Sequence, residues 1–381
     1  MSIASAQAAA AQHASTSGNY YNIQAGPIYL RFQGDMGVEL TDNATYSQIN
    51  PEGDIALWPT LNIKAFWPVT KENTLALSLG IGYVEYLRES SLSHLNITSD
   101  SGLEFKIYSG DFVFDLHDRI SAIDYATQDP SVSASFIRLE NTAGLKVDWD
   151  LDQLIISLGY DYDTFNSISG NFTYSDNVSD LFTGRAGFLV RGQDQFGLEI
   201  GGGLTAYNQN VLDNSTHYSA GLFYDARFTP HLTANISVGY TSYQFAHNGT
   251  VTNASDFNGY YANLTLNHQL NRAFSHSLSA GRQTSEGITA NLSEDYFANY
   301  QITWNFIRKV VTTFGFEYDY GNTSGGVIET YDRYGPNVGL AYKWTDKVTT
   351  SMTYNYYNKH SNVPTLSYSE NVLFLDFKYD F

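Results

Sequence analysis

Residues 154–163 read LIISLGYDYD and alternate strictly between two kinds of side chain. One set of alternate positions is apolar or aromatic and the intervening set is mostly small or acidic: Leu154, Ile156, Leu158, Tyr160 and Tyr162 against Ile155, Ser157, Gly159, Asp161 and Asp163. Successive side chains of a strand point to opposite faces of the sheet. The stretch therefore predicts a β-strand with one apolar face and one polar face.

The same alternation recurs along the chain from residue 26 onward, for example at 218–228 and 314–320. The connections between these runs alternate in length. Short ones such as 70–73 and 271–273 are followed by longer ones rich in Ser, Asn, Asp and Gly, such as 42–54 and 89–101. This asymmetry is typical of a transmembrane antiparallel up-and-down β-barrel, with tight turns at the periplasmic rim and longer loops outside.

The runs number about 18, with about 16 as the alternative, since strand boundaries are the least certain part of such an assignment. The chain enters before a long-loop hairpin and leaves after one, so the number is even and both termini are expected to be periplasmic. An even number of strands requires residues 102–126 to form two strands, separated by a turn at 108–111. Closure requires the first strand, near 28–40, to pair with the last one.

The length of the apolar faces favours a membrane over a soluble β-sandwich. A barrel strand tilted across the bilayer needs about 9–11 residues, whereas strands of soluble proteins average about 5–6. Aromatic pairs such as Tyr160 with Tyr162 and Trp304 with Phe306 lie toward the ends of the apolar faces. Tyr and Trp are enriched at membrane–water interfaces. We therefore expect an all-β barrel that occupies residues 26–381.

Residues 1–25 are expected to be the remnant of an export signal or a flexible segment. The start, MSIASAQAAAAQHAS, lacks the basic and long apolar regions of a signal peptide but contains Ala-x-Ala motifs.

The composition argues against several functions. Lys and Arg total 20 against 39 Asp and Glu, a formal net charge of −19, which disfavours a nucleic-acid partner. Cysteine is absent, so disulfides and Cys-ligated metals are excluded. The histidines lack metal-ligand spacing, and neither a nucleophile elbow nor a phosphate-binding loop is present. We expect no enzymatic activity, no cofactor and no metal site.

The last eight residues, FLDFKYDF at 374–381, keep the alternation to the final position. Phe377, Tyr379 and Phe381 share one apolar face. This ending resembles the signal that the barrel-assembly machinery recognises in Gram-negative outer-membrane proteins, and recognition would proceed by strand addition. The resemblance implies an outer-membrane location and that machinery as a partner.

Four further motifs resemble the beta-barrel porin type 2 family: LHDRI at 116–120, ENTAGL at 140–145, WDL at 149–151 and LGYDY at 158–162. The resemblance lies mainly over residues 100–200 and in the C-terminal strands. It implies an outer-membrane porin, and members of that family have poorly defined substrates.

The polar face of the predicted barrel supplies candidate pore-lining residues, because a barrel of about 18 strands is wide enough for an aqueous interior. These candidates are Asp115, His117, Arg119, Arg138, Glu140, Lys146, Asp161, Asp163, Arg185, Arg191, Glu199, Asp225 and Arg227. Charged walls sort solutes by charge. Alternatively, these residues pair with one another and only brace the wall.

The sequence thus predicts an outer-membrane porin through which small hydrophilic solutes diffuse passively, with a mild preference for cations. One alternative is a barrel that does not transport and serves as an anchor or adhesin; another is a sugar or polysaccharide channel. The expected partners are outer-membrane lipids, lipopolysaccharide and small solutes, and the barrel is expected to be a monomer or a homotrimer.

Overall fold

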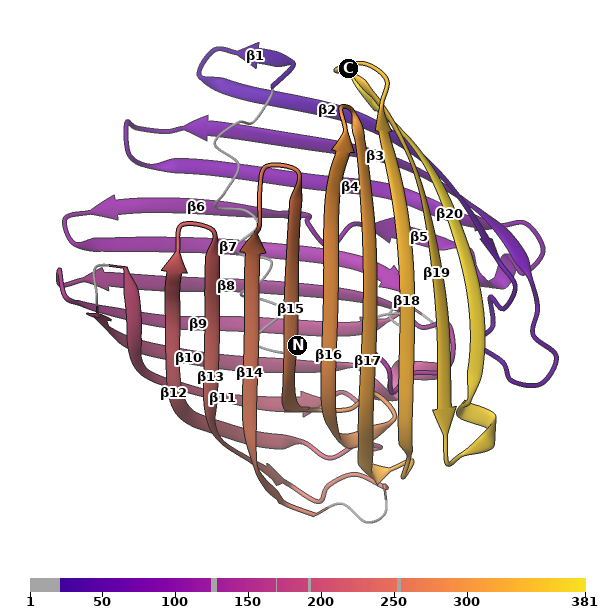
Figure 1. The fold of residues 1–381 in the computed structure, drawn as a ribbon. Coiled ribbons are helices and arrows are strands. Elements are labelled where there is room, and N and C mark those ends of the chain that lie inside the picture. Colours follow the sequence, from indigo (N-terminus) through magenta and orange to yellow (C-terminus); the bar gives the residue numbers. More distant parts are fainter. Residues whose placement is uncertain (1–20, 125–128, 169, 191–192, 252–254) are drawn as a thin grey trace.

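The computed structural model describes residues 21–381 except 125–128, 169, 191–192 and 252–254. The described chain forms a closed antiparallel barrel of 18 strands, as the sequence predicted (Figure 1). Within the described part of the chain, three short 3-10 helices lie in loops between strands. No helix in the described ranges is long and apolar enough to cross a membrane.

Strands and short helices follow one another along the chain in this order: β1 (Ile23–Ala25), β2 (Ile28–Thr41), β3 (Asp54–Pro68), β4 (Thr74–Tyr86), η1 (Ser90–Leu92), β5 (His94–Ile97), β6 (Gly102–Ser109), β7 (Phe112–Asp124), β8 (Ile137–Asp150), β9 (Leu154–Ser167), η2 (Gly170–Ser175), β10 (Asn177–Val190), β11 (Asp194–Tyr207), β12 (Ser215–Thr229), β13 (Leu232–Phe245), β14 (Phe257–Gln269), β15 (Phe274–Ser285), β16 (Ala290–Ile307), β17 (Val310–Gly326), β18 (Thr330–Lys343), β19 (Val348–Ser361), η3 (Pro364–Leu366) and β20 (Tyr368–Asp380).

Twenty strand segments make 18 barrel strands for two reasons. First, β1 is a short hairpin extension whose only partner strand among the described residues is β2. Second, β5 and β6 both pair with β4 and together form one interrupted strand. The predicted division of residues 102–126 is confirmed, because Gly110 turns the chain between β6 and β7 with a φ of 59°. The predicted closure is confirmed as well, since β2 pairs with β20.

The predicted loop at 89–101 is wrong in its middle. His94–Ile97 forms β5, in which His94 pairs with Val84 of β4. The chain is outside the sheet before β5, where η1 lies, and again at residues 98–101, where the Thr98 amide donates to the Gly80 carbonyl at 2.9 Å. A backbone near a sheet edge gains hydrogen bonds by joining it, so this short segment forms part of a strand instead of a longer loop.

The two faces of the barrel differ as the alternation requires. Leu198, Leu222 and Val238 lie opposite one another on β11, β12 and β13, and Leu198 is 61% exposed. The intervening positions, such as Glu199, point inward. An exposed apolar row on a closed barrel is the surface that hydrocarbon covers.

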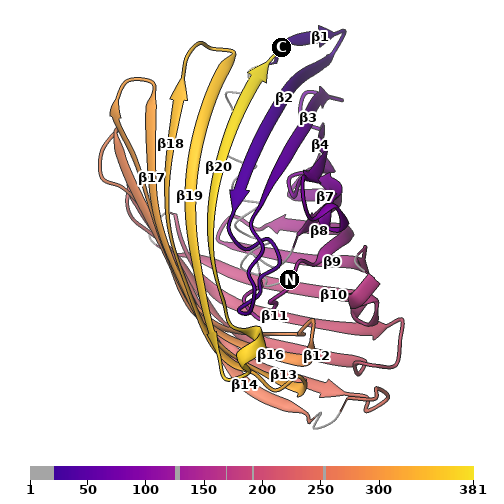
Figure 2. The ribbon, with the colours of Figure 1, turned by 90° about the vertical axis from the view of Figure 1, so that its right-hand side faces the viewer.

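The last strand ends where the first barrel strand begins (Figures 1 and 2). The Phe381 amide donates to the Phe32 carbonyl at 3.2 Å, and Tyr379 lies opposite Gly34. Both strand ends therefore lie at the rim that carries the short turns. Most of the predicted export-signal remnant at 1–25 falls outside the described residues.

Candidate functional site in the barrel lumen

The strand register places the predicted charged residues on the inner face of the wall. Lys146 lies between Asp115 and Gly159, and the next inward row joins His117, Gly144 and Asp161. One row further along these strands, Arg119, Thr142 and Asp163 are opposite one another, and beyond them lie Glu140 and Arg138. Arg185, Glu199, Asp225 and Arg227 continue the same face on β10, β11 and β12. Arg191 lies outside the described residues.

Most of these charges are paired with each other. The Nε2 atom of His117 is 2.8 Å from Oδ1 of Asp161. Arg138 is 3.3 Å from Glu140, and Lys146 is 3.0 Å from the neighbouring Asp148. Arg227 donates to the side chain of Gln193. The wall is therefore braced by its own charges, which is the alternative that the sequence left open, yet several pairs remain accessible from the lumen.

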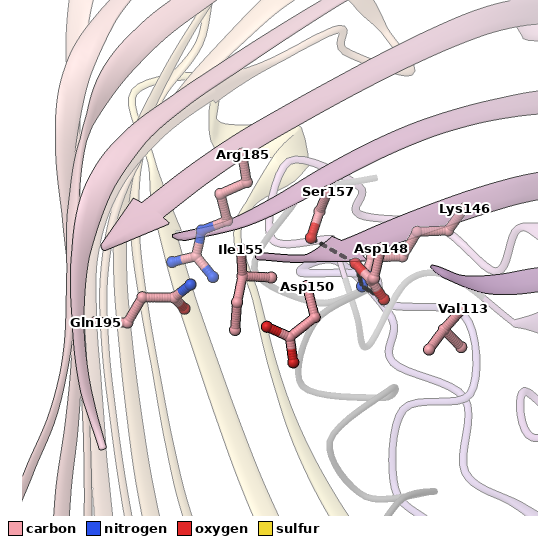
Figure 3. Close-up of a pocket in the computed structure, with 8 residues that line it drawn as sticks. All are labelled: Val113, Lys146, Asp148, Asp150, Ile155, Ser157, Arg185 and Gln195. Carbon is pink, nitrogen blue, oxygen red and sulfur yellow. Dashed lines mark hydrogen bonds and ion pairs between the residues drawn. The ribbon is translucent and has the colours of Figure 1, made fainter. Parts of the chain in front are cut away.

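A cavity of about 370 Å³ opens beside these pairs, on the half of the barrel that carries the short turns. Figure 3 shows side chains from β7, β8, β9, β10 and β11 around it. Those that line it are Val113, Lys146, Asp148, Asp150, Ile155, Ser157, Arg185 and Gln195. The Ser157 hydroxyl donates to Asp148 across neighbouring strands. Six of its eight lining residues are polar, and these include two cationic and two acidic side chains.

Arg185 lines the cavity and also contacts acidic side chains of β11 and β12. Its Nη1 atom is 3.2 Å from Asp225 and its Nε atom is 3.7 Å from Glu199. The guanidinium group also lies over the Phe223 ring, 3.5 Å from its centroid. A stacked and doubly paired Arg keeps one orientation. It therefore presents a fixed charge to any solute in the cavity.

The other half of the lumen, which carries the longer loops, is filled by side chains. Buried apolar residues from several loops and strands meet there in one cluster: Tyr46, Val132, Phe136, Phe165, Ile288 and Tyr368. Tyr46 comes from the β2–β3 connection, Val132 from β7–β8 and Ile288 from β15–β16. Because these connections start at separate points of the rim, their contact means that the loops fold over the lumen.

A buried ion pair anchors one of these loops to the wall. Lys359 of β19 is 2.9 Å from Glu329, and both side chains are 0% exposed. The same ammonium group donates to the Ser131 carbonyl at 3.3 Å and to the Ser133 hydroxyl at 2.9 Å. Ser133 in turn donates to the Leu366 carbonyl at 2.7 Å. The β7–β8 loop is thus tied to the far end of β19 and the β19–β20 connection.

Sequence reasoning missed this second cluster of charges. It includes Arg333, which is 3.1 Å from Asp319 and 3.4 Å from Glu317, besides Lys359 and Glu329. The alternation of β19 places Lys359 on the same face as Tyr357 and would have identified it as inward. No local pattern in the sequence, however, shows that the β7–β8 loop reaches it.

Comparison with protein families identifies a porin family. The family model described as "Putative beta-barrel porin 2" matches residues 176–381, more than half of the chain. No curated protein matches the sequence.

Several solved structures share the fold. A BenF-like porin from Pseudomonas fluorescens Pf-5 is 9% identical, with a TM-score of 0.53, and the match covers 93% of this chain and 99% of that one. Pseudomonas aeruginosa OccK2 (OpdF), solved in complex with glucuronate, is 8% identical, with a TM-score of 0.52 and coverage of 93% and 98%. At such identities, the likeness concerns the fold alone.

Proposed function

The chain belongs to the beta-barrel porin 2 family, and on this premise we propose that small hydrophilic solutes diffuse passively through its charged lumen. As a member of that family it is an outer-membrane β-barrel porin. The observation that carries the proposal is the cavity of about 370 Å³ beside the inner wall, which two cationic and two acidic side chains line. Charged and hydroxyl side chains favour solutes that keep their water shell or form hydrogen bonds.

We further propose a mild preference for cations. Lys146 and Arg185 line the cavity, as do the carboxylates of Asp148 and Asp150. Glu199 and Asp225 add two carboxylates beside Arg185. Carboxylates thus outnumber cations around the cavity, and the whole chain carries a formal charge of −19. A wall with excess negative charge raises the local concentration of cations.

Planar-bilayer recording tests both parts of the proposal. We expect single channels whose reversal potential in a KCl gradient shows K⁺ passing more readily than Cl⁻. We also expect replacement of Asp148 and Asp150 together by Asn to reduce that preference, because it removes two wall charges. A wild-type channel that prefers Cl⁻ would contradict the charge argument, whereas the absence of any conductance would contradict the porin itself.

One observation favours the alternative of an anchor or adhesin, namely the loop-bearing half that is filled by side chains. A barrel blocked there would conduct nothing, so the same recording separates the two functions. A sugar channel would need aromatic residues along the lumen. Tyr261 is an inward residue of this kind, and its hydroxyl donates to Glu199 at 2.9 Å. The glucuronate bound by OccK2 is a solute of the size class that we propose.

The orientation and assembly of the barrel also belong to the proposal. We place the short-turn rim, with the ends of β2 and β20, on the periplasmic side. Phe377, Tyr379 and Phe381 would then form the strand that the barrel-assembly machinery recognises. Lipopolysaccharide would surround the rim that carries the longer loops.

A further inference from the structure

Two histidines lie directly opposite each other on the outer surface of the barrel. His268 of β14 is the register partner of His276 of β15. Both lie on the outward face, because His268 is also opposite Leu232 of β13 and His276 is opposite Ile302 of β16. His268 is the penultimate residue of β14 and His276 the third residue of β15. The pair therefore lies close to the short-turn rim.

The two imidazole rings approach each other through nitrogen atoms. Nδ1 of His268 is 3.0 Å from Nε2 of His276. On the other side of the ring, Nδ1 of His276 is 3.3 Å from the Tyr300 hydroxyl. When the Nδ1–H of His276 donates to Tyr300, the lone pair of its Nε2 atom faces His268. A hydrogen bond to the second ring nitrogen is the usual means of orienting a metal-binding histidine.

The separation of the two nitrogens matches one kind of coordination. With metal–nitrogen bonds of about 2.0–2.1 Å, donors that are 3.0 Å apart subtend roughly 95° at the metal. That angle corresponds to neighbouring positions in a square-planar or tetragonal complex, the geometry of Cu²⁺ and Ni²⁺. A tetrahedral Zn²⁺ ion requires a wider angle, and Cu²⁺ also has the highest affinity for nitrogen donors in the divalent series.

We propose that His268 and His276 form a surface site for a square-planar divalent metal ion, Cu²⁺ before Ni²⁺. Cross-strand neighbours hold their Cβ atoms about 4.5–5.5 Å apart, so both nitrogens are positioned before the ion arrives. Without metal, the Nδ1–H of His268 donates to Nε2 of His276, and metal binding requires the His268 tautomer that carries its proton on Nε2. In the described part of the chain, no cluster of three or more His, Cys, Asp or Glu is arranged to hold a metal. Water completes the coordination of this two-histidine site.

The surroundings suit a site at the membrane boundary. Tyr300 and Trp304 lie on the same outward face of β16, and Phe274 is opposite Trp304. Such aromatic residues mark the interface where headgroups and water meet the hydrocarbon. An ion can therefore reach the pair from the aqueous phase at this rim without passing through the lumen, so the site does not depend on the pore being open.

Calorimetric titration of the detergent-solubilised barrel with Cu²⁺, in the presence of a weak competing chelator, tests the proposal. We expect one tight ion per barrel. His268→Asn and His276→Asn should each weaken that binding by about 10² or more, because a single imidazole loses the advantage of two linked donors. His360→Asn is the matched control, since His360 is also outward on β19, opposite Asp332, but has no histidine partner in register; it should bind Cu²⁺ like the wild type.

Electron paramagnetic resonance gives a second measurement that does not depend on affinity. The wild type and the His360→Asn variant should both show Cu²⁺ coupled to two imidazole nitrogens. The proposal is overturned if His268→Asn or His276→Asn keeps wild-type affinity, or if the spectrum shows one nitrogen. Electrophoretic mobility before and after heating confirms that each variant is a folded barrel before it is titrated.

Discussion

Lys146 and Lys359 both point into the barrel, but their surroundings are opposite. The Lys146 side chain is 48% exposed and pairs with Asp148 in the cavity. The Lys359 side chain is 0% exposed and pairs with a fully buried Glu329. Exposed pairs contribute at most about 1 kcal/mol, whereas a buried charge that loses its partner costs several times more. The same residue type therefore lines a cavity in one place and holds a loop in the other.

Replacement of Lys359 tests this difference at the level of one side chain. We expect Lys359→Met to lower the free energy of unfolding by about 3–5 kcal/mol, because the Glu329 carboxylate is left buried without its cation. The double variant K359M/E329Q should recover most of that loss. Urea unfolding in detergent or lipid gives the comparison. Lys146→Met is the matched control, with an expected change within about 1 kcal/mol; equal losses in the two single variants would refute the assignment.

The sequence was sufficient to predict which face of the barrel wall a residue lies on, but not how deeply its side chain is buried. Alternation with period two is a local property, so Asp161, Arg185 and Glu199 could all be placed on the inner wall before the structure was known. Which of these side chains form ion pairs depends on the register between neighbouring strands, and the sequence did not predict that register residue by residue. The burial of Lys359 depends on the β7–β8 loop, whose contacts across the lumen join residues more than 200 positions apart, and local patterns carry no such information.

At the scale of the strands, the seam between β2 and β20 is the element that closes the barrel. Gly37 of β2 lies opposite Asp376 on one side and Trp58 on the other. The Trp58 and Phe374 rings meet edge to face, with centroids 5.8 Å apart. A Cβ atom on Gly37 would lie 2.5 Å from Phe374 and 3.0 Å from Trp58. The glycine therefore leaves room for an aromatic contact over the inner side of the seam.

Enlarging this glycine should weaken closure. We expect Gly37→Val to cost about 1–3 kcal/mol, because its added methyl groups displace Phe374 from Trp58. Gly34→Val on the same strand should be tolerated, since a Cβ atom there would lie 3.6 Å from the Phe381 ring, an ordinary van der Waals distance. Urea midpoints and the fraction of refolded barrel that migrates as a compact species give the measurement. A Gly34 variant as unstable as the Gly37 variant would show that the seam, rather than the aromatic contact, is sensitive.

Strand number and closure were predictable from the sequence because both follow from repeated local signals. Turn residues and alternating faces recur regularly along the chain. A closed barrel whose two ends lie at the same rim must also have an even number of strands, which fixes the uncertain strand boundaries. The error at 89–101 has the opposite cause. His94–Ile97 is only four residues long, and it becomes a strand because β4 offers it hydrogen-bond partners. The pairing of such a segment depends on its neighbours and not on its own composition.

At the scale of the whole molecule, the lumen consists of two unlike halves. The half with short turns contains the polar cavity, and the half with longer loops contains the apolar cluster and the buried ion pairs. A solute at the short-turn rim would therefore meet a cavity that charged side chains line. From the other rim it meets loops that are anchored to the wall, so we expect that rim to control passage.

Single cysteines can map this asymmetry, because the chain contains no cysteine of its own. Ser157 lines the cavity, and Ser361 points into the loop-bearing half, where it is 5% exposed. We expect S157C to react with a charged, membrane-impermeant thiol reagent at least about tenfold faster than S361C, because thiol reactivity follows exposure. The reagent should also act faster when added from the short-turn side of a planar bilayer, and modification of S157C should lower the conductance. Similar rates for the two variants would show that the loops leave the lumen open from end to end, and faster reaction of S361C would reverse the assignment of the two halves.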